Sequence, residues 1–153
     1  AVMNRGRLAQ VGEPAAVYEW PASRWVADFI GEVTIIPGRL GPDRATIKSP
    51  VGALRISSVP TLVPGEEIAL ALRPEKLVLA AERTAQSGGN ALAGVIGEVG
   101  YRGDVSLYQV QLADGSLIKV ARANTHARGA ARFAVGDRVW VSWPADAGVV
   151  LKE

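Results

Sequence analysis

The side chains that could do chemistry in this sequence are few, and their spacing does not form a catalytic site. The single histidine, His126, could serve as a general base, but it lies in an apparent loop and no Gly-x-Ser-x-Gly nucleophile motif accompanies it. The adjacent carboxylates Glu66 and Glu67 would point to opposite faces of a strand, which separates them. The absence of cysteine excludes thiolate nucleophiles, thiolate zinc sites and disulfides. The sequence therefore predicts a chain that is not an enzyme and holds no metal.

A nucleotide-binding loop is also missing. The phosphate-binding loop of many ATPases requires the spacing G-x-x-x-x-G-K-[S/T], and no Gly-Lys pair occurs in this chain. Residues 86–90, Gln-Ser-Gly-Gly-Asn, are rich in glycine but do not join a strand to a helix. We interpret them as a flexible connector and expect no cofactor in this chain.

Three polar residues that follow a predicted strand are candidates for a docking site or a ligand cleft. They are Arg73, Glu75 and Lys76. A strand-end turn with a local ion pair would explain them, and an exposed pair of this kind stabilises a fold by well under about 1 kcal/mol. Alternatively, they line a cleft between two small barrels or dock against a neighbouring domain.

An aromatic residue beside a cation marks a second candidate surface. Strand alternation over residues 138–143 places Trp140 and Arg138 on the face opposite to the core. Such a pair suits stacking on single-stranded nucleic acid or contact with another protein. One tryptophan does not make a stacking surface, so nucleic acid is the alternative and is not expected. We hypothesise that Trp140 lies in the contact between two copies of the chain.

The composition is that of a folded, weakly charged protein. Of 153 residues, 48% are hydrophobic and 21% charged, and the formal net charge is +2. These values exclude disorder as the main state, and the small net charge permits an anionic partner without implying one. No apolar run reaches the roughly 18 residues of a membrane-spanning helix. The length suits one domain or two small ones.

From residue 32 onward, short apolar and alternating runs predict a mainly β fold. Two series of five strands are expected, separated by a polar break at residues 82–90. Asp114-Gly115 is a strong hairpin signal between two of these strands. The expected strands span residues 33–40, 45–48, 53–57, 68–73 and 77–80, and then 92–101, 106–112, 116–122, 138–143 and 149–151.

The two series resemble each other. Residues 51–54 match residues 114–117 at an offset of 63, and residues 65–70 match residues 136–141 at an offset of 71. Matched turns in two five-strand units suggest a duplicated small barrel or two halves of one composite barrel. We expect the halves to span about 32–81 and 91–153.

The first 31 residues have a different pattern. We expect a terminal hairpin that is the remnant of a larger upstream domain, followed by short helices at residues 14–19 and 24–30. Ser23 is a plausible N-cap for the second helix. Trp20 and Trp25 are expected to pack this helical junction onto a barrel.

The junction resembles a segment of ATP-binding cassette importer ATPases. In that family, Q-x-G-x-P-x-x-x-Y-x-x-P closes the nucleotide-binding domain, and V-A-x-F-I-G leads into a C-terminal regulatory domain. The first motif is present at residues 10–21 and the second at residues 26–31. Leu72-Arg73-Pro74-Glu75-Lys76 is similar to the R-P-E segment of the regulatory domain, and its second half is matched by the segments at 103–108, 114–115 and 136–143.

This resemblance implies a transport-associated domain of the tandem oligonucleotide/oligosaccharide-binding-barrel type. The implied organisation is an ATPase tail and junction at residues 1–31, followed by a regulatory domain at residues 32–153. The closing stretch at residues 136–151 looks most like spermidine/putrescine importers, although iron(III), sulfate and sugar importers share much of the pattern. The phosphate loop, signature motif, catalytic carboxylate and switch histidine of the family are absent from this chain.

The partners that the resemblance implies are those of an importer subunit. They are the subunit's own ATPase domain, which would bind ATP and Mg²⁺, a second copy in a homodimer, membrane permease subunits, and a small solute in a regulatory cleft. The implied location is cytoplasmic, peripheral on the inner face of the cell membrane. The implied role is to support the dimer and regulate solute uptake.

Overall fold

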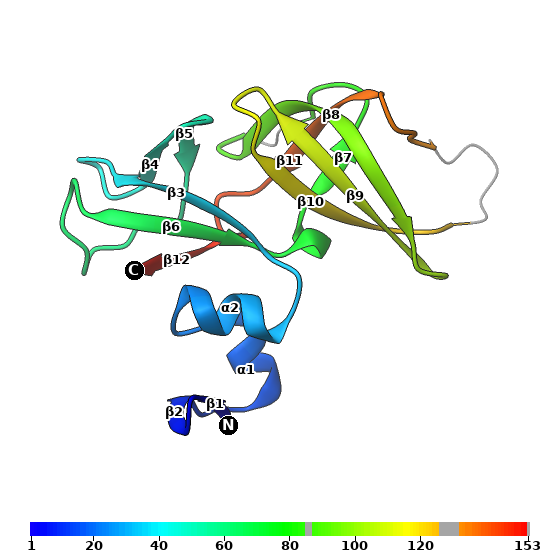
Figure 1. Cartoon of the computed structure of the whole chain (residues 1–153). Helices are drawn as coiled ribbons and strands as arrows, with labels where there is room; N and C mark the ends of the chain where they lie inside the picture. The colour runs from blue at the N-terminus through cyan, green and yellow to red at the C-terminus, as the bar shows by residue number, and fades with distance from the viewer. Residues whose placement is uncertain (85–86, 126–131, 153) are drawn as a thin grey trace.

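The computed structural model describes residues 1–84, 87–125 and 132–152. Two curled sheets stand side by side (Figure 1). A small helical segment, which comprises the two short helices and the turn between them at residues 14–30, lies below the first sheet. The mainly β fold with two five-stranded units is confirmed. The elements are β1 (Val2–Asn4), β2 (Arg7–Gln10), α1 (Pro14–Glu19), α2 (Arg24–Ile30), β3 (Thr34–Leu40), β4 (Thr46–Ser49), β5 (Gly52–Arg55), β6 (Glu67–Leu72), the 3₁₀ turn η1 (Pro74–Lys76), β7 (Val78–Ala80), β8 (Asn90–Tyr101), β9 (Val105–Leu112), β10 (Leu117–Ala123), β11 (Arg138–Trp143) and β12 (Val149–Lys152).

The two sheets exchange their last strands. The first sheet has the order β12-β6-β3-β4-β5 and the second β10-β9-β8-β11-β7, with antiparallel pairing throughout. Thus β7 joins the second sheet beside β11, and β12 returns to the first sheet beside β6 (Figure 1). Among the described residues, each expected half therefore gives four strands to one sheet and one to the other. Periodicity could not predict this exchange, because it reports the faces of a strand and not its partner.

The backbone repeats the duplication that the sequence suggested. Gly65 and Gly136 precede β6 and β11 and have φ angles of +84° and +91°, which only glycine adopts readily. The Gly65 N–H donates to the Leu40 carbonyl at 2.7 Å, and the Gly136 N–H donates to the Ile96 carbonyl at 2.8 Å. The two halves therefore share their turn geometry as well as their strand order.

Both sheets contribute to one hydrophobic core. In β11 the alternation holds as expected, because Val139, Val141 and Trp143 are all buried. Burying such side chains is the main favourable term in folding, at roughly 25 cal/mol per Å² of apolar surface. The largest fully buried side chains of this shared core are Leu40, Ile47, Leu54, Ile68, Leu70, Leu72, Ile96, Ile118, Val110, Val120 and Val139.

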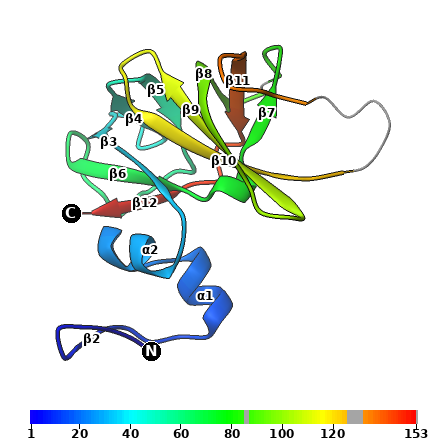
Figure 2. The ribbon, with the colours of Figure 1, turned by 45° about the vertical axis from the view of Figure 1, so that its right-hand side comes forward.

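Helix α2 covers the outer face of the first sheet (Figure 2). Its N-cap is Ser23, as expected, because the Ser23 hydroxyl accepts a hydrogen bond from the Val26 N–H at 3.2 Å. Ala27 is fully buried in a small apolar cluster with Ala71 and Leu151. The small side chain of Ala71 on β6 leaves room for the helix to approach the sheet closely.

The expected packing of two tryptophans onto a barrel is wrong. Trp20 is 67% exposed and Trp25 is 38% exposed. Trp25 instead stacks on Phe29, with 4.9 Å between the ring centroids, and Phe29 is itself 64% exposed. The buried face of α2 is formed by Val26 and Ala27, so small residues dock the helix and its aromatic residues face outward.

Candidate functional site

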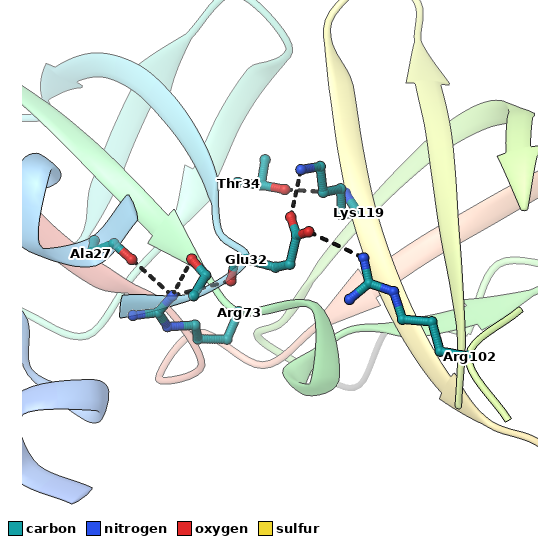
Figure 3. Close-up of polar contacts among 7 residues, drawn as sticks. Ala27, Glu32, Thr34, Arg73, Arg102 and Lys119 are labelled. Atoms are coloured by element: carbon teal, nitrogen blue, oxygen red, sulfur yellow. Dashed lines mark hydrogen bonds and ion pairs between the residues drawn. The ribbon is translucent and has the colours of Figure 1, made fainter. Parts of the chain in front are cut away.

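Arg73 is the central residue of the junction between the helical segment and the sheets. It follows β6 and is buried, with 6% of its surface exposed. Its Nη1 donates to the carbonyl oxygens of Ala27 at 3.0 Å, Gly31 at 3.0 Å and Glu32 at 3.1 Å (Figure 3). Carbonyls at a helix C-terminus have no partner within the helix, and a cation there also interacts favourably with the helix dipole. Arg73 therefore caps α2 with a side chain from another element.

Arg73, Glu75 and Lys76 all contact residues of α1. The Arg73 guanidinium lies over the ring of Tyr18, and Nη2 donates to the Tyr18 carbonyl at 3.4 Å. The Tyr18 hydroxyl donates to Glu75 Oε1 at 2.5 Å, and Lys76 forms an ion pair with Glu19. Burial, followed by the hydrogen bond to Glu75, raises the pKa of Tyr18 to about 12. The three residues thus contact the helical segment and do not form an ion pair with one another.

A second polar group ties the same junction to the second sheet. The Glu32 carboxylate accepts from Lys119 Nζ at 2.6 Å and from Arg102 Nη2 at 3.3 Å (Figure 3). The Lys119 backbone N–H donates to Thr34 Oγ1 at 3.1 Å. The hydrogen bond from Lys119, with a smaller effect of Arg102, keeps the pKa of Glu32 below its usual value. Sequence reasoning missed this group, because Glu32 lies 70 and 87 residues before Arg102 and Lys119 and no local pattern connects them.

These contacts make residues 31–34 a strap between the two sheets. Arg73, at the end of β6, holds the backbone of Glu32, and Lys119, on β10, holds its side chain. Gln10 fastens the other end of the helical segment, since its amide donates to the Trp20 carbonyl at 2.9 Å and accepts from the Ala22 N–H at 2.8 Å. Hydrogen bonds therefore connect the helical segment to both sheets.

The adjacent carboxylates Glu66 and Glu67, weighed from the sequence as an acid–base pair, are held by different cations. Glu66 pairs with Lys152 at 2.8 Å and Glu67 pairs with Arg39 at 2.6 Å, so each carboxylate has a separate partner. His126 lies outside the described residues. No group of three or more His, Cys, Asp or Glu residues that could hold a metal ion is found within residues 1–84, 87–125 and 132–152. No described helix has the length and apolar character to span a membrane.

Trp140 and Arg138 lie on the outer face of the second sheet. Arg138 is exposed, and Trp140 is half-buried with the Arg83 guanidinium 5.6 Å from its ring centroid. Both residues line a shallow groove of about 470 Å³ that also includes Val95 and Leu112. Val95 is 41% exposed. The groove is thus mainly apolar, with the cation Arg138 among its lining residues.

Comparisons with known proteins agree with the architecture. The family model described as TOBE domain matches residues 70–151. The putrescine transport ATP-binding protein PotG of Escherichia coli is 36% identical over 99% of this chain and 41% of its own length. The spermidine/putrescine import ATP-binding protein PotA of Rubrobacter xylanophilus is 38% identical over 99% of this chain and 40% of its own. The chain thus spans about two fifths of the length of these relatives.

A similar fold is found in the cytoplasmic molybdate-binding protein ModG, solved with molybdate bound. The TM-score is 0.67 at 13% sequence identity, covering 78% of this chain and 96% of that one. At that identity the likeness concerns the fold alone.

Proposed function

The chain belongs to the TOBE domain family, and on that basis we propose that it is the regulatory, dimer-supporting part of the ATP-binding subunit of an importer. The solute class that we propose is polyamines, because the relatives named above are putrescine and spermidine/putrescine import proteins. ATP and Mg²⁺ would bind in the remaining part of such a subunit, so this chain by itself would not hydrolyse ATP. Its place would be the cytoplasmic face of the membrane, held there by the permease subunits.

The observation that carries this proposal is the buried contact of Arg73 with the helical segment. That segment overlaps both motifs that resemble the end of an importer ATPase domain. Arg73 joins it to β6, and Glu32 continues the connection to β10. A movement that begins in an attached ATPase domain would reach both sheets along this path, and a constraint on the sheets would act back on the ATPase.

The test is ATP hydrolysis and spermidine uptake by a reconstituted importer whose ATP-binding subunit contains this chain. We expect Arg73→Gln to weaken the dependence of ATP hydrolysis on the solute-loaded binding protein, because the helical segment loses its connection to the sheets. Arg39→Gln is the matched control, since it removes an exposed arginine that pairs with Glu67 away from the junction. Equal solute dependence in the wild type and in Arg73→Gln would contradict the proposed coupling.

Dimer support is the second part of the proposal, and we assign it to the groove around Trp140 and Arg138. A mainly apolar groove with a cation among its lining residues can bury area against a second copy while its charge remains solvated. Sedimentation equilibrium of this chain, with and without millimolar spermidine or putrescine and with Mg-ATP as a control, separates the alternatives. Self-association that does not change with Mg-ATP would favour a dimer-supporting role. A change in self-association on adding polyamine would favour a regulatory cleft. A strict monomer under all conditions contradicts dimer support by this chain.

A further inference from the structure

Arg55 and Lys119 occupy equivalent positions in the duplicated fold. Strands β4 and β9 correspond at an offset of 63, so that Thr46 matches Gln109. Thr46 pairs with Arg55 on β5, and Gln109 pairs with Lys119 on β10, so strand pairing gives β5 and β10 an offset of 64, one more than the sequence match across the turn. The two cations therefore stand at the same place, one in each sheet.

The backbones of these two residues make the same kind of contact with the start of the other sheet's central strand. The Lys119 N–H donates to Thr34 Oγ1 at 3.1 Å, where Thr34 is the first residue of β3. The Arg55 N–H donates to Asn90 Oδ1 at 2.7 Å, where Asn90 is the first residue of β8. Each sheet thus meets the other through one such contact, and the two junctions form a matched pair.

The first of these two junctions, where Lys119 contacts Thr34, contains a carboxylate. Glu32 stands two residues before Thr34, and its carboxylate lies between Lys119 Nζ at 2.6 Å and Arg102 Nη2 at 3.3 Å. The chain itself therefore shows what this position accommodates: an anion held between two cations.

The second junction contains Arg55 in the place of Lys119 but no carboxylate, and Arg83, which follows β7, lines the same site. Gly88 stands two residues before Asn90, in the place that corresponds to Glu32, and has no side chain. A Cβ atom at Gly88 would lie 3.9 Å from Arg55 Nη1, so the missing side chain would point toward this guanidinium. A hollow of about 520 Å³ occupies the site and is lined by Arg55, Arg83, Gly88, Gly89 and Asn90, among others.

Neither arginine of this hollow is neutralised by an acid in the described part of the chain. Arg83 contacts the Trp140 ring, and the contacts of Arg55 with Asn90 are made by its backbone alone. Guanidinium groups bind carboxylate and phosphate groups through paired N–H donors, and both groups are small enough to enter a hollow of this size. Asn90 is 5% exposed and is fixed at both ends of its amide by the Arg55 backbone, which gives the hollow a rigid floor.

We propose that this hollow binds a small anion through a carboxylate or phosphate group, in the position that the Glu32 carboxylate takes at the equivalent junction. The ligand would bridge Arg55 on β5 and Arg83, which follows β7, and would thereby link the edges of the two sheets. The proposal does not depend on the transport function. It rests on the internal equivalence and on the two unneutralised arginines.

Isothermal titration calorimetry of the chain with inorganic phosphate and, separately, with succinate tests the proposal at low ionic strength. We expect saturable binding of at least one anion, which identifies the preferred group. Arg55→Gln and Arg83→Gln should each weaken binding by about tenfold, because each removes one charge-assisted contact. Arg39→Gln is the control for the change in net charge and should leave the dissociation constant within about twofold.

Amide chemical shifts locate the ligand independently of the variants. Titration with the anion that binds should move the signals of Arg55, Gly89 and Asn90 more than those of the Glu32 junction. The proposal is overturned if neither anion saturates the protein at concentrations up to about 20 mM, a range where weak sites still register. It is also overturned if Arg39→Gln weakens binding as much as the two hollow variants, since the binding would then follow net charge alone.

Discussion

The guanidinium carbon of Arg73 lies 4.2 Å from the ring centroid of Tyr18, a residue 55 positions earlier in the chain. The same guanidinium binds the carbonyls at the end of α2, so one side chain from the first sheet holds both short helices. Helices of six and seven residues do not persist alone in water, and tertiary contacts of this kind have to stabilise them.

Replacing Arg73 by glutamine should destabilise the chain by about 2–4 kcal/mol, because several buried carbonyls lose their donor together. Lysine should rescue only part of this loss, since an ammonium group lacks the planar fork of guanidinium. Urea unfolding followed by circular dichroism measures the effect. The exposed Arg39→Gln should change stability by less than about 1 kcal/mol. Equal midpoints for the wild type and Arg73→Gln would show that the junction contributes little to stability.

The ionisation of Tyr18 provides a readout at alkaline pH. Its pKa is raised from 10.0 to about 12, so the folded state holds the phenolic proton more tightly than the unfolded state does. The resulting stability is fully present below about pH 10 and is lost as the pH rises toward 12. Tyrosinate absorbance should show one late transition in the wild type that Tyr18→Phe removes. If Tyr18→Phe instead removes an early transition, the contact with Glu75 is not formed in solution.

Glu32 should contribute stability at neutral pH that disappears in acid. Its pKa in the folded state lies below the ordinary value of 4.5, so this contribution is present above that value and is lost as the pH falls through the folded-state pKa. Glu32→Gln should make the free energy of unfolding fall less steeply as the pH is lowered. Its effect at neutral pH should be below about 1 kcal/mol, because the group is partly exposed. Urea unfolding at several pH values from 3 to 7 is the measurement. Glu67→Gln, which removes an exposed ion pair of the first sheet, is the comparison, and an unchanged pH dependence in Glu32→Gln would contradict the role of the strap.

Self-association should depend on Trp140. Replacement by alanine should weaken it by about tenfold or more, because a buried aromatic residue commonly contributes 2 kcal/mol or more at an interface. Sedimentation equilibrium over a range of protein concentrations is the check. Trp20→Ala removes a tryptophan that is 67% exposed on the helical segment and serves as the control. An association constant that is indifferent to Trp140, or equally sensitive to Trp20, would assign the contact to another surface.

The sequence alone predicted much of the architecture. The strands near β6 and β11, the N-cap at Ser23 and the matched turns all follow from local rules, since alternation, capping and positive φ angles are properties of a few neighbouring residues. The junction motifs also indicated the family. The same local reasoning pointed to Arg73, Glu75 and Lys76 but left open whether they form a local pair or contact another element.

Partner choice was decided by the tertiary structure. Alternation shows which residues of β7 and β12 are apolar, but both strands could pair within their own half, and only the closure of the two curled sheets exchanges them. The contact between Glu32 and Lys119 spans 87 residues, and the match of Arg55 with Lys119 follows from strand register. Local sequence determines the faces and turns because these depend on neighbouring residues. The long-range contacts form only where the whole chain brings distant strands together.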